Sequence, residues 1–307
     1  MTTGPHSASM HVPVLLQEVL TYLDCRPGKT IVDATVGTAG HSQAILERIT
    51  PGGKLIAIDR DKETIEVARQ RLKHFSEAVV FCHGNFSDID THLARLNISG
   101  VDGMLFDFGI SSFQLKDPSR GLSFQDTGPL DMRLDRTQKL TAGDIVNTWG
   151  QEEIAEIIKE FGEERWCKRI ASAIVRARQQ HPVETTEELE EVVFRAVPAR
   201  FRHYRIHPAT RTFQAIRIAV NSELEAIEQV LRKSIGLLHP GARICAISFH
   251  SLEDRIVKHA FRDSARQGLL KVLTRKPVEP SDDEIQKNPS SRSSKLRAAE
   301  RVYHELI

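Results

Sequence analysis

The stretch DATVGTAGHS, residues 33–42, combines residue types that can bind a ligand. Asp33 ends an apolar run, Gly37 and Gly40 follow, and a helix-like segment starts near His41. Glycines let the backbone pass close to a ligand. In an open parallel sheet the ligand crevice lies beyond the carboxyl ends of the strands, where the strand order reverses. We therefore expect this loop, with Asp33, to form one wall of a binding site.

The next apolar run, KLIAID at 54–59, ends in Asp59. An acid at this position can accept hydrogen bonds from ribose hydroxyls, which predicts a nucleoside-bearing cofactor. A nicotinamide dinucleotide site expects GxGxxG, and the third glycine is missing here. S-adenosylmethionine carries a cationic sulfonium and no phosphate, so it tolerates Asp33, which would repel a pyrophosphate. The residues favour the methyl donor over two alternatives, a nicotinamide cofactor and a tight turn without a ligand.

A third acid, Asp107, ends the apolar run VDGMLFDFG at 101–109. Its carboxylate could accept a hydrogen from an exocyclic amine and direct the nitrogen lone pair at the sulfonium methyl. Aromatic amines are weak nucleophiles, so positioning would carry much of the catalysis. The methylated amine is more acidic and loses its proton afterwards, so no strong general base is needed. Asp107 is therefore the candidate catalytic residue.

Three look-alike motifs do not support other chemistries. DFG at 107–109 is a kinase triplet, but no glycine-rich loop or HRD segment accompanies it. GISSF at 109–113 lacks the second glycine of a GxSxG nucleophile elbow. His250 and His259, with Glu253, have no HExxH spacing and are expected to be polar or capping residues, so no metal site is predicted.

The elements that would position these acids alternate along the chain. Apolar runs at 30–35, 54–59, 78–84 and 101–109 are separated by amphipathic segments. This pattern predicts an α/β, Rossmann-like fold with a parallel sheet covered by helices on both faces.

Helical periodicity alone follows from Leu140 to about Leu231. Thr185 and Glu188 have capping-box spacing, and one continuous helical run is expected from Phe213 to Leu231. After a turn at 239–241, a strand returns at 243–249, followed by a helix that Ser251 and Asp254 would cap. We expect a discontinuous cofactor-binding domain, 11–112 with 232–307, and an inserted loop and helical substrate domain, 113–231.

Composition limits the class of protein. The formal net charge is +1, so any basic surface must be local. Four well-separated cysteines indicate reduced thiols. The N-terminus lacks the features of a signal peptide, and no run is long enough to span a membrane, so a cytoplasmic protein is predicted.

Several blocks together resemble one family, the RsmH (MraW) family of bacterial S-adenosylmethionine-dependent methyltransferases that act on cytidine N4 in the decoding region of 16S rRNA. The blocks include HVPVLLQEVL (11–20), DATVGTAGHS, HGNFSDI (83–89), the long segment at 107–135, HPATRTFQAIRIAVNSEL (207–224) and SFHSLEDRIVK (248–258). The resemblance extends from His11 to Val302. It implies a class I methyltransferase fold with an inserted all-helical domain, an rRNA substrate within the small subunit, and a possible homodimer.

The resemblance also assigns residue roles. Ala39, Gly40 and His41 would contact the cofactor, Asp59 its ribose and Phe86 its adenine side. Asp107 and Gln114 would contact the methionine end or the incoming base. Core packing is the alternative for Phe86, and a loop hydrogen bond for Gln114. The chain departs from the family pattern at Ala39, Phe113, Lys116 and Thr127.

RNA contacts are expected in the inserted domain. Between Glu191 and Glu223 the chain has no acid, and arginines alternate there with aromatic residues. Guanidiniums can neutralise phosphates, and aromatic rings can stack on unpaired bases, although a solvated basic face is the alternative. The expected RNA-binding residues are Arg200, Arg202, Tyr204, Arg205 and Arg211.

Further cations follow in the tail, at Arg292, Lys295, Arg297 and Arg301. The amine of a paired cytosine is occupied, so the target must be single-stranded or flipped out. The 120–135 loop is expected either to form a lid or to be held by an Asp131–Arg133 ion pair. Other functions left open are methylation of another amine, in DNA or protein, and a non-catalytic RNA-binding assembly factor.

Overall fold

The computed structural model describes residues 13–203 and 206–303. The chain divides into two compact units. The sheet unit comprises Met1–Gly109 with Ile227–Ile307, and the helical unit comprises Ile110–Ala226. The boundaries expected from the sequence were 112/113 and 231/232, within five residues of the observed ones.

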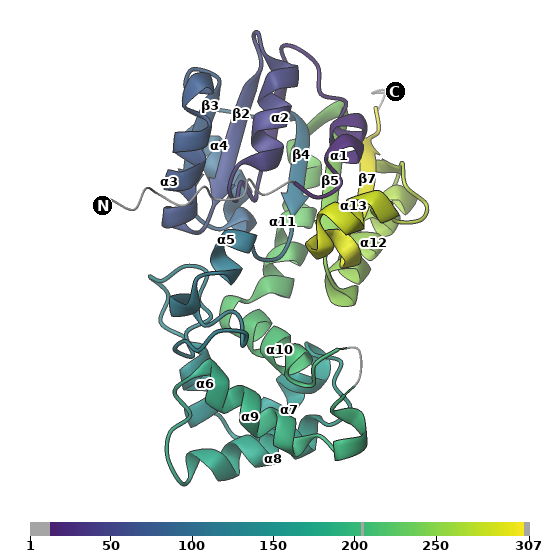
Figure 1. The fold of residues 1–307 in the computed structure, drawn as a ribbon. Coiled ribbons are helices and arrows are strands. Elements are labelled where there is room, and N and C mark those ends of the chain that lie inside the picture. The colour runs from purple at the N-terminus through teal and green to yellow at the C-terminus, as the bar shows by residue number, and fades with distance from the viewer. Residues whose placement is uncertain (1–12, 204–205, 304–307) are drawn as a thin grey trace, which may run out of the picture. The chain divides into compact units, whose positions relative to one another are not determined.

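The sheet unit contains a seven-stranded sheet in the order β3-β2-β1-β4-β5-β7-β6 (Figure 1). The first five strands are parallel, and β7 pairs antiparallel with both of its neighbours. This is a Rossmann-like doubly wound order, with the antiparallel strand near one edge. The strands are β1 (Thr30–Asp33), β2 (Lys54–Asp59), β3 (Val79–His83), β4 (Val101–Asp107), β5 (Leu238–Ser248), β6 (Leu270–Val272) and β7 (Lys295–Arg301).

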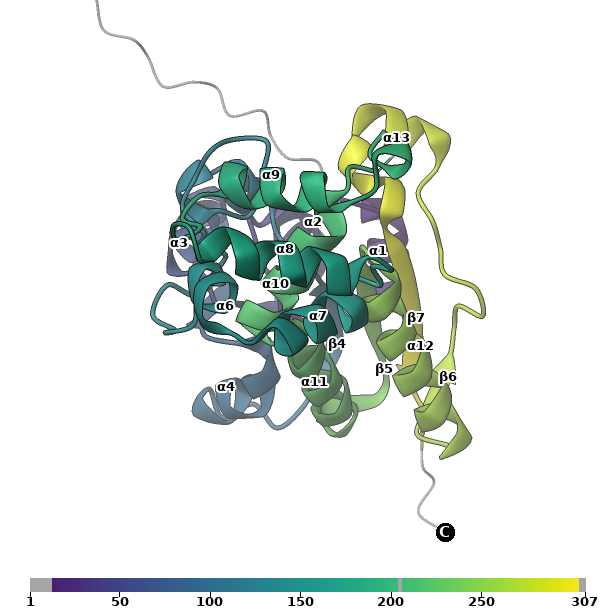
Figure 2. The same cartoon turned by 90° about the horizontal axis from the view of Figure 1, so that it is seen from below.

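Helices cover both faces of this sheet because successive strand residues point to opposite sides. Ile31 and Leu55 belong to the apolar cluster formed with α1, α2 and α3, whereas Val32 and Ile56 belong to the cluster formed with α4, α11 and α12. Figure 2 shows the two sets of helices from another direction. Their bounds are α1 (Leu16–Leu23), α2 (Gly40–Ile49), α3 (Lys62–Arg71), α4 (Ile89–Arg95), α11 (Glu223–Leu237) and α12 (Ser251–Arg266). Short elements complete the unit: η1 (Lys73–Phe75), η2 (Phe86–Asp88), α13 (Asp282–Lys287) and η5 (Pro289–Ser293).

The helical unit has an apolar core of its own, in which Ile145, Ile158, Ile174 and Leu189 are fully buried. The predicted capping box is confirmed, since Thr185 accepts from the Glu188 N–H and the Glu188 carboxylate accepts from the Thr185 N–H. The elements are α5 (Ser112–Leu115), η3 (Pro118–Arg120), α6 (Ala142–Thr148), α7 (Gln151–Glu160), α8 (Cys167–Arg178), α9 (Thr186–Ala196), η4 (Ala199–Phe201) and α10 (Ala209–Asn221).

Three local expectations were wrong. The run from Phe213 to Leu231 forms two helices, because Ser222 adopts a left-handed conformation with φ 47° and ends α10. The segment 239–241 lies inside β5 at a shift in its register with β4, and forms no turn before the strand. The cap of α12 is His250 paired with Glu253, one residue before the predicted cap.

No helix within the described residues is both long enough and apolar enough to cross a membrane.

Candidate active site at the carboxyl ends of the strands

The sheet places two of the predicted acids beside each other. β1 and β4 are parallel neighbours, with Asp33 opposite Leu105, so Asp107 lies two residues further along the adjacent strand. The strand order reverses between these two strands, because β2 and β3 lie on one side and β5 lies on the other. The structure therefore brings Asp33 and Asp107 to the switch point at which open α/β sheets bind ligands.

Asp33 clamps the loop that follows β1. One carboxylate oxygen accepts the Ser42 hydroxyl at 2.6 Å, and the other accepts the Thr35 N–H at 3.2 Å. Burial raises the pKa of Asp33 to about 6; the Ser42 and Thr35 hydrogen bonds oppose this shift, and the Asp59 charge adds to it. The local role of Asp33 is thus to tie the start of the loop to the first turn of α2.

The loop between β1 and α2 has a backbone that favours glycine. Gly37 has φ 50°, and a Cβ on Gly40 would lie 2.9 Å from a Pro13 side-chain carbon. Ala39 is also left-handed, with φ 64°, a conformation that costs a residue with a Cβ about 1–2 kcal/mol. Its methyl group is fully buried within the apolar cluster of α1 and α2. Alanine at position 39, where the resembled family usually has glycine, therefore strains the backbone and adds a methyl group to the core.

Asp59 joins the end of β2 to this loop. Its carboxylate accepts the Gly37 N–H at 3.0 Å and the Asp61 N–H at 2.9 Å. Burial is the largest influence and raises the pKa of Asp59, although both backbone hydrogen bonds lower it. The side chain is half-buried, and each carboxylate oxygen has a second lone pair for a further donor.

Asp107 is held at the end of β4 with one oxygen unmatched. Its N–H donates to the Thr35 hydroxyl at 2.6 Å, and its Oδ2 lies 3.6 Å from His41 Nδ1. Its Oδ1 is buried and has no hydrogen-bond partner among the described residues. Burial, then the charges of Asp33 and Glu253, raise the pKa of Asp107 well above its usual range.

His41 connects Asp107 to the segment that precedes α1. Its Nε2 lies 2.8 Å from the Val14 carbonyl oxygen, which can only accept, so Nε2 carries the hydrogen. The Nδ1 atom consequently faces the Asp107 carboxyl group. The two side chains can share one proton, either as a neutral pair or as an imidazolium and a carboxylate.

Two contributors to this region were not predicted as site residues, although Glu253 was considered and set aside as a metal ligand. Thr35 holds both the Asp33 carboxylate, through its N–H, and the Asp107 N–H, through its hydroxyl. Glu253 on α12 is buried, and its carboxylate accepts the Phe249 N–H at 2.7 Å. A threonine and a capping glutamate carry no catalytic signature in a sequence, and only the adjacency of β4 and β5 brings Glu253 toward Asp107.

Phe86 takes part in an aromatic cluster. Its ring lies 6.4 Å from Phe106 and 5.7 Å from Phe108, measured between centroids. It is only half-buried, so core contacts on one side are compatible with a ligand on the other. The predicted adenine contact stays a prediction.

Gln114 lies in the helical unit, on α5. It is buried, and its side-chain carbonyl accepts the Ser111 N–H at 3.1 Å. The loop hydrogen bond that was the alternative to ligand binding is therefore present, and the cofactor contact stays a prediction.

The predicted RNA-binding arginines differ in the contacts that they make within the protein. Arg202 donates to the carbonyls of Val197 and Arg195, and Arg211 donates to the Glu163 carbonyl. Arg200 lies over the Phe201 ring, 4.7 Å from its centroid. Tyr204 and Arg205 lie outside the described residues.

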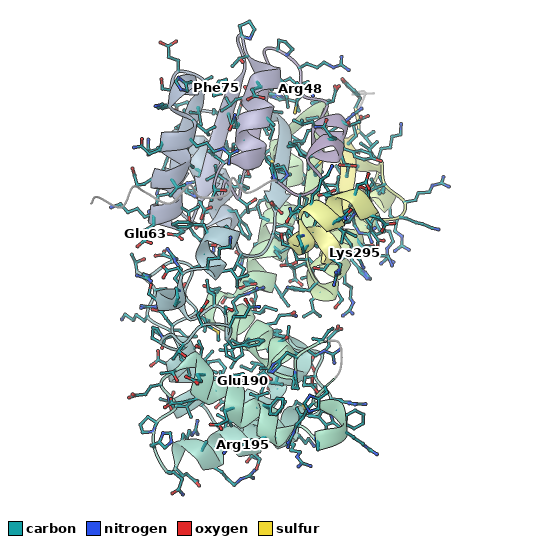
Figure 3. All side chains as sticks on the ribbon, in the orientation of Figure 1. Arg48, Glu63, Phe75, Glu190, Arg195 and Lys295 are labelled. Atoms are coloured by element: carbon teal, nitrogen blue, oxygen red, sulfur yellow. The ribbon has the colours of Figure 1, made fainter. Side chains whose placement is uncertain are left out.

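Acids at both ends of the acid-free stretch neutralise its first and last cations. Arg195, labelled on α9 in Figure 3, pairs with Glu191, and Arg217 forms two 2.9 Å hydrogen bonds with Glu223. In the tail, Arg297 is buried and pairs with Asp254 at 2.7 Å. The basic surface of these segments is smaller than their composition indicates.

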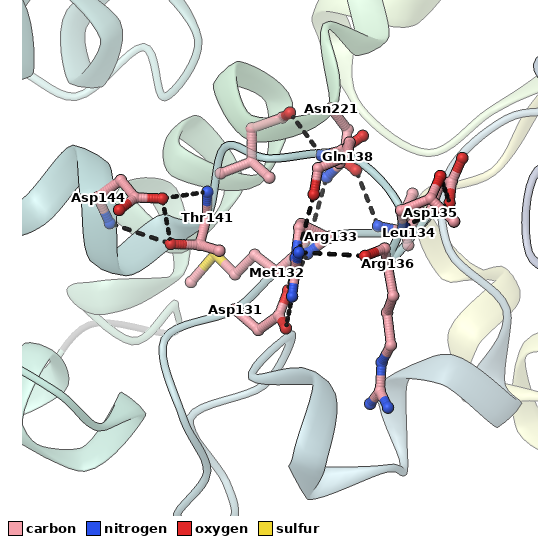
Figure 4. A network of polar contacts seen from close by, with 12 residues as sticks. Asp131, Met132, Arg133, Leu134, Asp135, Arg136, Gln138, Thr141, Asp144 and Asn221 are labelled. Atoms are coloured by element: carbon pink, nitrogen blue, oxygen red, sulfur yellow. Dashed lines mark hydrogen bonds and ion pairs between the residues drawn. The ribbon is translucent and has the colours of Figure 1, made fainter.

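The loop proposed as a lid is tied down at its end. Arg133 forms a two-pronged ion pair with Asp131, at 2.7 and 2.8 Å, and also donates to the Arg136 and Gln138 carbonyls (Figure 4). Asn221 accepts the Leu134 N–H. The ion pair is present, and the segment that contains it is part of the ordered helical unit.

Taken together, the doubly wound sheet and the acids at its switch point define a class of protein, the Rossmann-like methyltransferases. An acidic crevice at this point suits a cationic cofactor, and the glycine loop and unmatched Asp107 oxygen leave polar atoms for a ligand.

The chain belongs to the MraW methylase family, whose pattern matches residues 8–302. S-adenosylmethionine is accordingly its methyl donor.

Relatives match over almost the full length. The chain is 47% identical over 307 residues to "Ribosomal RNA small subunit methyltransferase H" of Halothermothrix orenii, covering 95% of this chain and 98% of that one. It is 50% identical over 308 residues to the protein of the same name from Geobacter sulfurreducens, covering 95% and 99%. Among solved structures, an rRNA methylase from Streptococcus thermophilus aligns with a TM-score of 0.45 and 10% identity, covering 96% and 100%.

Proposed function

We propose that this methyltransferase modifies the N4 amine of a cytidine in 16S rRNA, within the small ribosomal subunit. Relatives near 50% identity are named as ribosomal RNA small subunit methyltransferases, which supports an rRNA substrate. The observation that carries the choice of an amine is the buried, unmatched Oδ1 of Asp107 at the switch point. An acceptor at that position suits an N–H donor.

Asp107 would position the amine. When bound, S-adenosylmethionine supplies a methyl group on a sulfonium, whose sulfur keeps the electron pair as the bond to carbon breaks. One N–H of the cytidine amine donates to Asp107 Oδ1, which directs the nitrogen lone pair toward the methyl group. After transfer, the methylated nitrogen would be strongly acidic, and its proton would pass to the Asp107 carboxylate that accepts its hydrogen bond. Positioning of this kind can contribute about 7–11 kcal/mol to lowering the barrier.

The rest of the crevice would hold the cofactor. Asp59 has lone pairs for ribose hydroxyls beside its two backbone donors, and the loop at Gly37, Ala39 and Gly40 brings its backbone to the crevice. Burial is the largest cause of the raised pKa values of Asp33 and Asp107, and the charges of neighbouring acids add to it, so a sulfonium cation would offset that negative charge. His41 would act through Asp107, by setting the orientation of its carboxyl group.

The helical unit would bind the flanking RNA. Arg165 and Arg200 both lie over the Phe201 ring, at 4.1 and 4.7 Å from its centroid. Stacked guanidiniums of this kind offer a planar face to an unpaired base and charge to a phosphate. We assign the first RNA contacts to this group, with Arg202, Tyr204, Arg205 and Arg211 beside it in the sequence. The small-subunit context and a homodimer stay predictions.

The test is transfer of a labelled methyl group to 16S rRNA, free and in assembled small subunits, followed by nucleoside analysis. Asp107→Ala removes the acceptor oxygen that would position the amine. We expect N4-methylcytidine with the wild type and a loss of about 100-fold or more with the variant, because positioning carries much of the lowering of the barrier. Asp88→Ala, at an exposed acid on η2, is the matched control and should keep full activity.

Two outcomes would overturn the proposal. Label on DNA or on a protein amine, with none on RNA, would assign another amine substrate. RNA and cofactor binding without transfer to any substrate would instead assign a non-catalytic assembly role.

A further inference from the structure

The sheet unit contains a groove that the proposed reaction does not use. It lies between α11 and α12, has a volume of about 930 Å³, and is also lined by Leu269 and Arg301. Its floor is apolar and includes the half-buried Ile235, Ile256 and Ala260. Arg232 and Arg255 are exposed on its rim, together with the acid Glu228. Every lining residue belongs to the sheet unit.

The groove borders a strongly basic segment. From Arg255 to Lys276 the chain has seven lysines and arginines and a single acid, Asp263, in a protein whose formal net charge is +1. Asp263 lies 3.3 Å from both Arg262 and Arg266, so this one charge is shared between two cations.

Three arginines of α12 form a basic stripe along one side of the helix. Arg255, Arg262 and Arg266, with His259 between them, are spaced by three or four residues, which places them on one helical face. All four are exposed. The other acids of this helix interact away from the stripe, since Glu253 is buried at the helix cap and Asp254 pairs with Arg297. The stripe therefore presents positive charge beside the apolar floor.

The course of α12 connects this groove to the candidate active site. The helix begins three residues after β5 ends at Ser248, at the edge of the sheet that holds Asp107. The groove residues run along it from Arg255 to Gln267, roughly 18 Å at the rise of an α-helix. The groove thus follows the sheet unit away from the catalytic edge.

We infer that this groove binds a single-stranded segment of the RNA substrate, a second contact separate from the helical unit. Unpaired bases would lie on the apolar floor and against the guanidinium planes of the rim, while phosphates follow the basic stripe of α12. The basic stripe complements the charge of both RNA and an acidic peptide. The apolar floor favours RNA, because it offers contact to base faces. This inference rests on the proposed action on RNA.

The first experiment measures binding of the full chain to a fluorescent, unstructured single-stranded oligoribonucleotide at several salt concentrations. The double variant Arg262→Ala, Arg266→Ala removes two exposed cations of the α12 stripe. The matched control, Arg48→Ala, Arg95→Ala, removes two exposed cations on α2 and α4, and Figure 3 labels Arg48.

We expect at least a tenfold rise in Kd for the groove variant. Its dependence of log K on log salt should be shallower by about 1.4, since each phosphate contact to a single strand contributes about 0.7. The control should show a wild-type Kd. Equal RNA affinities of the two double variants would overturn the inference, as would competition by polyglutamate as strong as that by RNA.

A second experiment locates the contact directly. Photo-crosslinking of 4-thiouridine in the same RNA should label peptides that contain residues 255–269. Crosslinks confined to the helical unit would overturn the groove assignment.

The two proposals fail differently. If the wild type methylates RNA and the groove variant binds like the control, only the groove is wrong. If the wild type neither binds nor methylates RNA, the proposed function itself fails.

Discussion

Replacing Asp33 by asparagine should stabilise the protein at neutral pH. The carboxyl group is 1% exposed, and burial raises its pKa from 3.8 to about 6. A tenfold change in proton affinity is worth about 1.4 kcal/mol, so keeping this group ionised in the folded chain costs about 3 kcal/mol. Asparagine resembles the protonated acid. Its carbonyl can accept the Thr35 N–H, and its amide can donate to the Ser42 hydroxyl, which rotates to accept.

The sign of the pH dependence follows from the raised pKa. The folded state binds the Asp33 proton more tightly than the unfolded state, so the contribution of this group to stability is fully present below pH 3.8. It is lost as the pH rises through about 6 and is constant above that. Asp33→Asn should therefore exceed the wild type by up to about 3 kcal/mol at pH 7.5 and by nothing near pH 4.

The measurement must report on the sheet unit. Both tryptophans, Trp149 and Trp166, belong to the helical unit, so their fluorescence follows the wrong part of the chain. Hydrogen exchange of peptides that cover β1, measured in urea between pH 4 and 8, gives the free energy of unfolding at the mutated site. Asp88→Asn controls for loss of a surface charge. A variant no more stable than the wild type at pH 7.5, or a difference that is the same at every pH, would refute this reasoning.

The same substitution should change catalysis. The Asp33 charge is one cause of the raised pKa of Asp107, so its removal lowers that pKa. If methyl transfer needs ionised Asp107, the acid limb of the rate profile should move to lower pH in Asp33→Asn. An unmoved limb would show that Asp107 ionisation does not control the rate.

Three further predictions concern stability. Ser42→Ala should cost about 1–3 kcal/mol in a urea titration at pH 7.5, because it leaves an oxygen of buried Asp33 without its 2.6 Å donor. Gly121→Ala should destabilise the helical unit by at least about 2 kcal/mol, measured by tryptophan fluorescence, because its Cβ would overlap the Pro129 carbonyl oxygen at φ 62°. Arg133→Lys should cost about 1–3 kcal/mol in the same assay, since lysine cannot reproduce the two-pronged pair and both carbonyl contacts. Wild-type unfolding midpoints would contradict each of them.

The strands that carry the site could be predicted because their signal is local. Each is a short apolar run that ends in an acid, and Asp33, Asp59 and Asp107 are the last residues of β1, β2 and β4. The rule that ligands bind at the carboxyl ends of parallel strands then locates the crevice without knowledge of side-chain contacts. The parallel sheet with helices on both faces follows from the same alternation of strands and helices, whereas the strand order comes from the structure.

Elements whose stability depends on distant partners could not be predicted. α1 is short, and one of its anchors is the Leu15 N–H, which donates to Glu284, 269 residues away in the sequence. The break at Ser222 interrupts an apolar period that continues in phase on both sides, so periodicity alone indicates one helix. The pairing of Arg217 with Glu223 likewise shows that counting cations between two acids overstates the charge that is available to a ligand.

The charges of several acids at the crevice favour the binding of a cation. Asp33, Asp107 and Glu253 come from different parts of the sequence. Burial raises the pKa of Asp107, and the charges of Asp33 and Glu253 raise it further. Such crowding costs stability in the folded chain without ligand. A cation placed among these groups removes part of that cost, so its binding energy includes the relief of the repulsion. The acids therefore favour a sulfonium over a neutral thioether, and the product of methyl transfer should leave the crevice more readily than the methyl donor. A measured Kd for S-adenosylhomocysteine that is below that for S-adenosylmethionine, in the wild type but not in Asp33→Asn, would contradict this account.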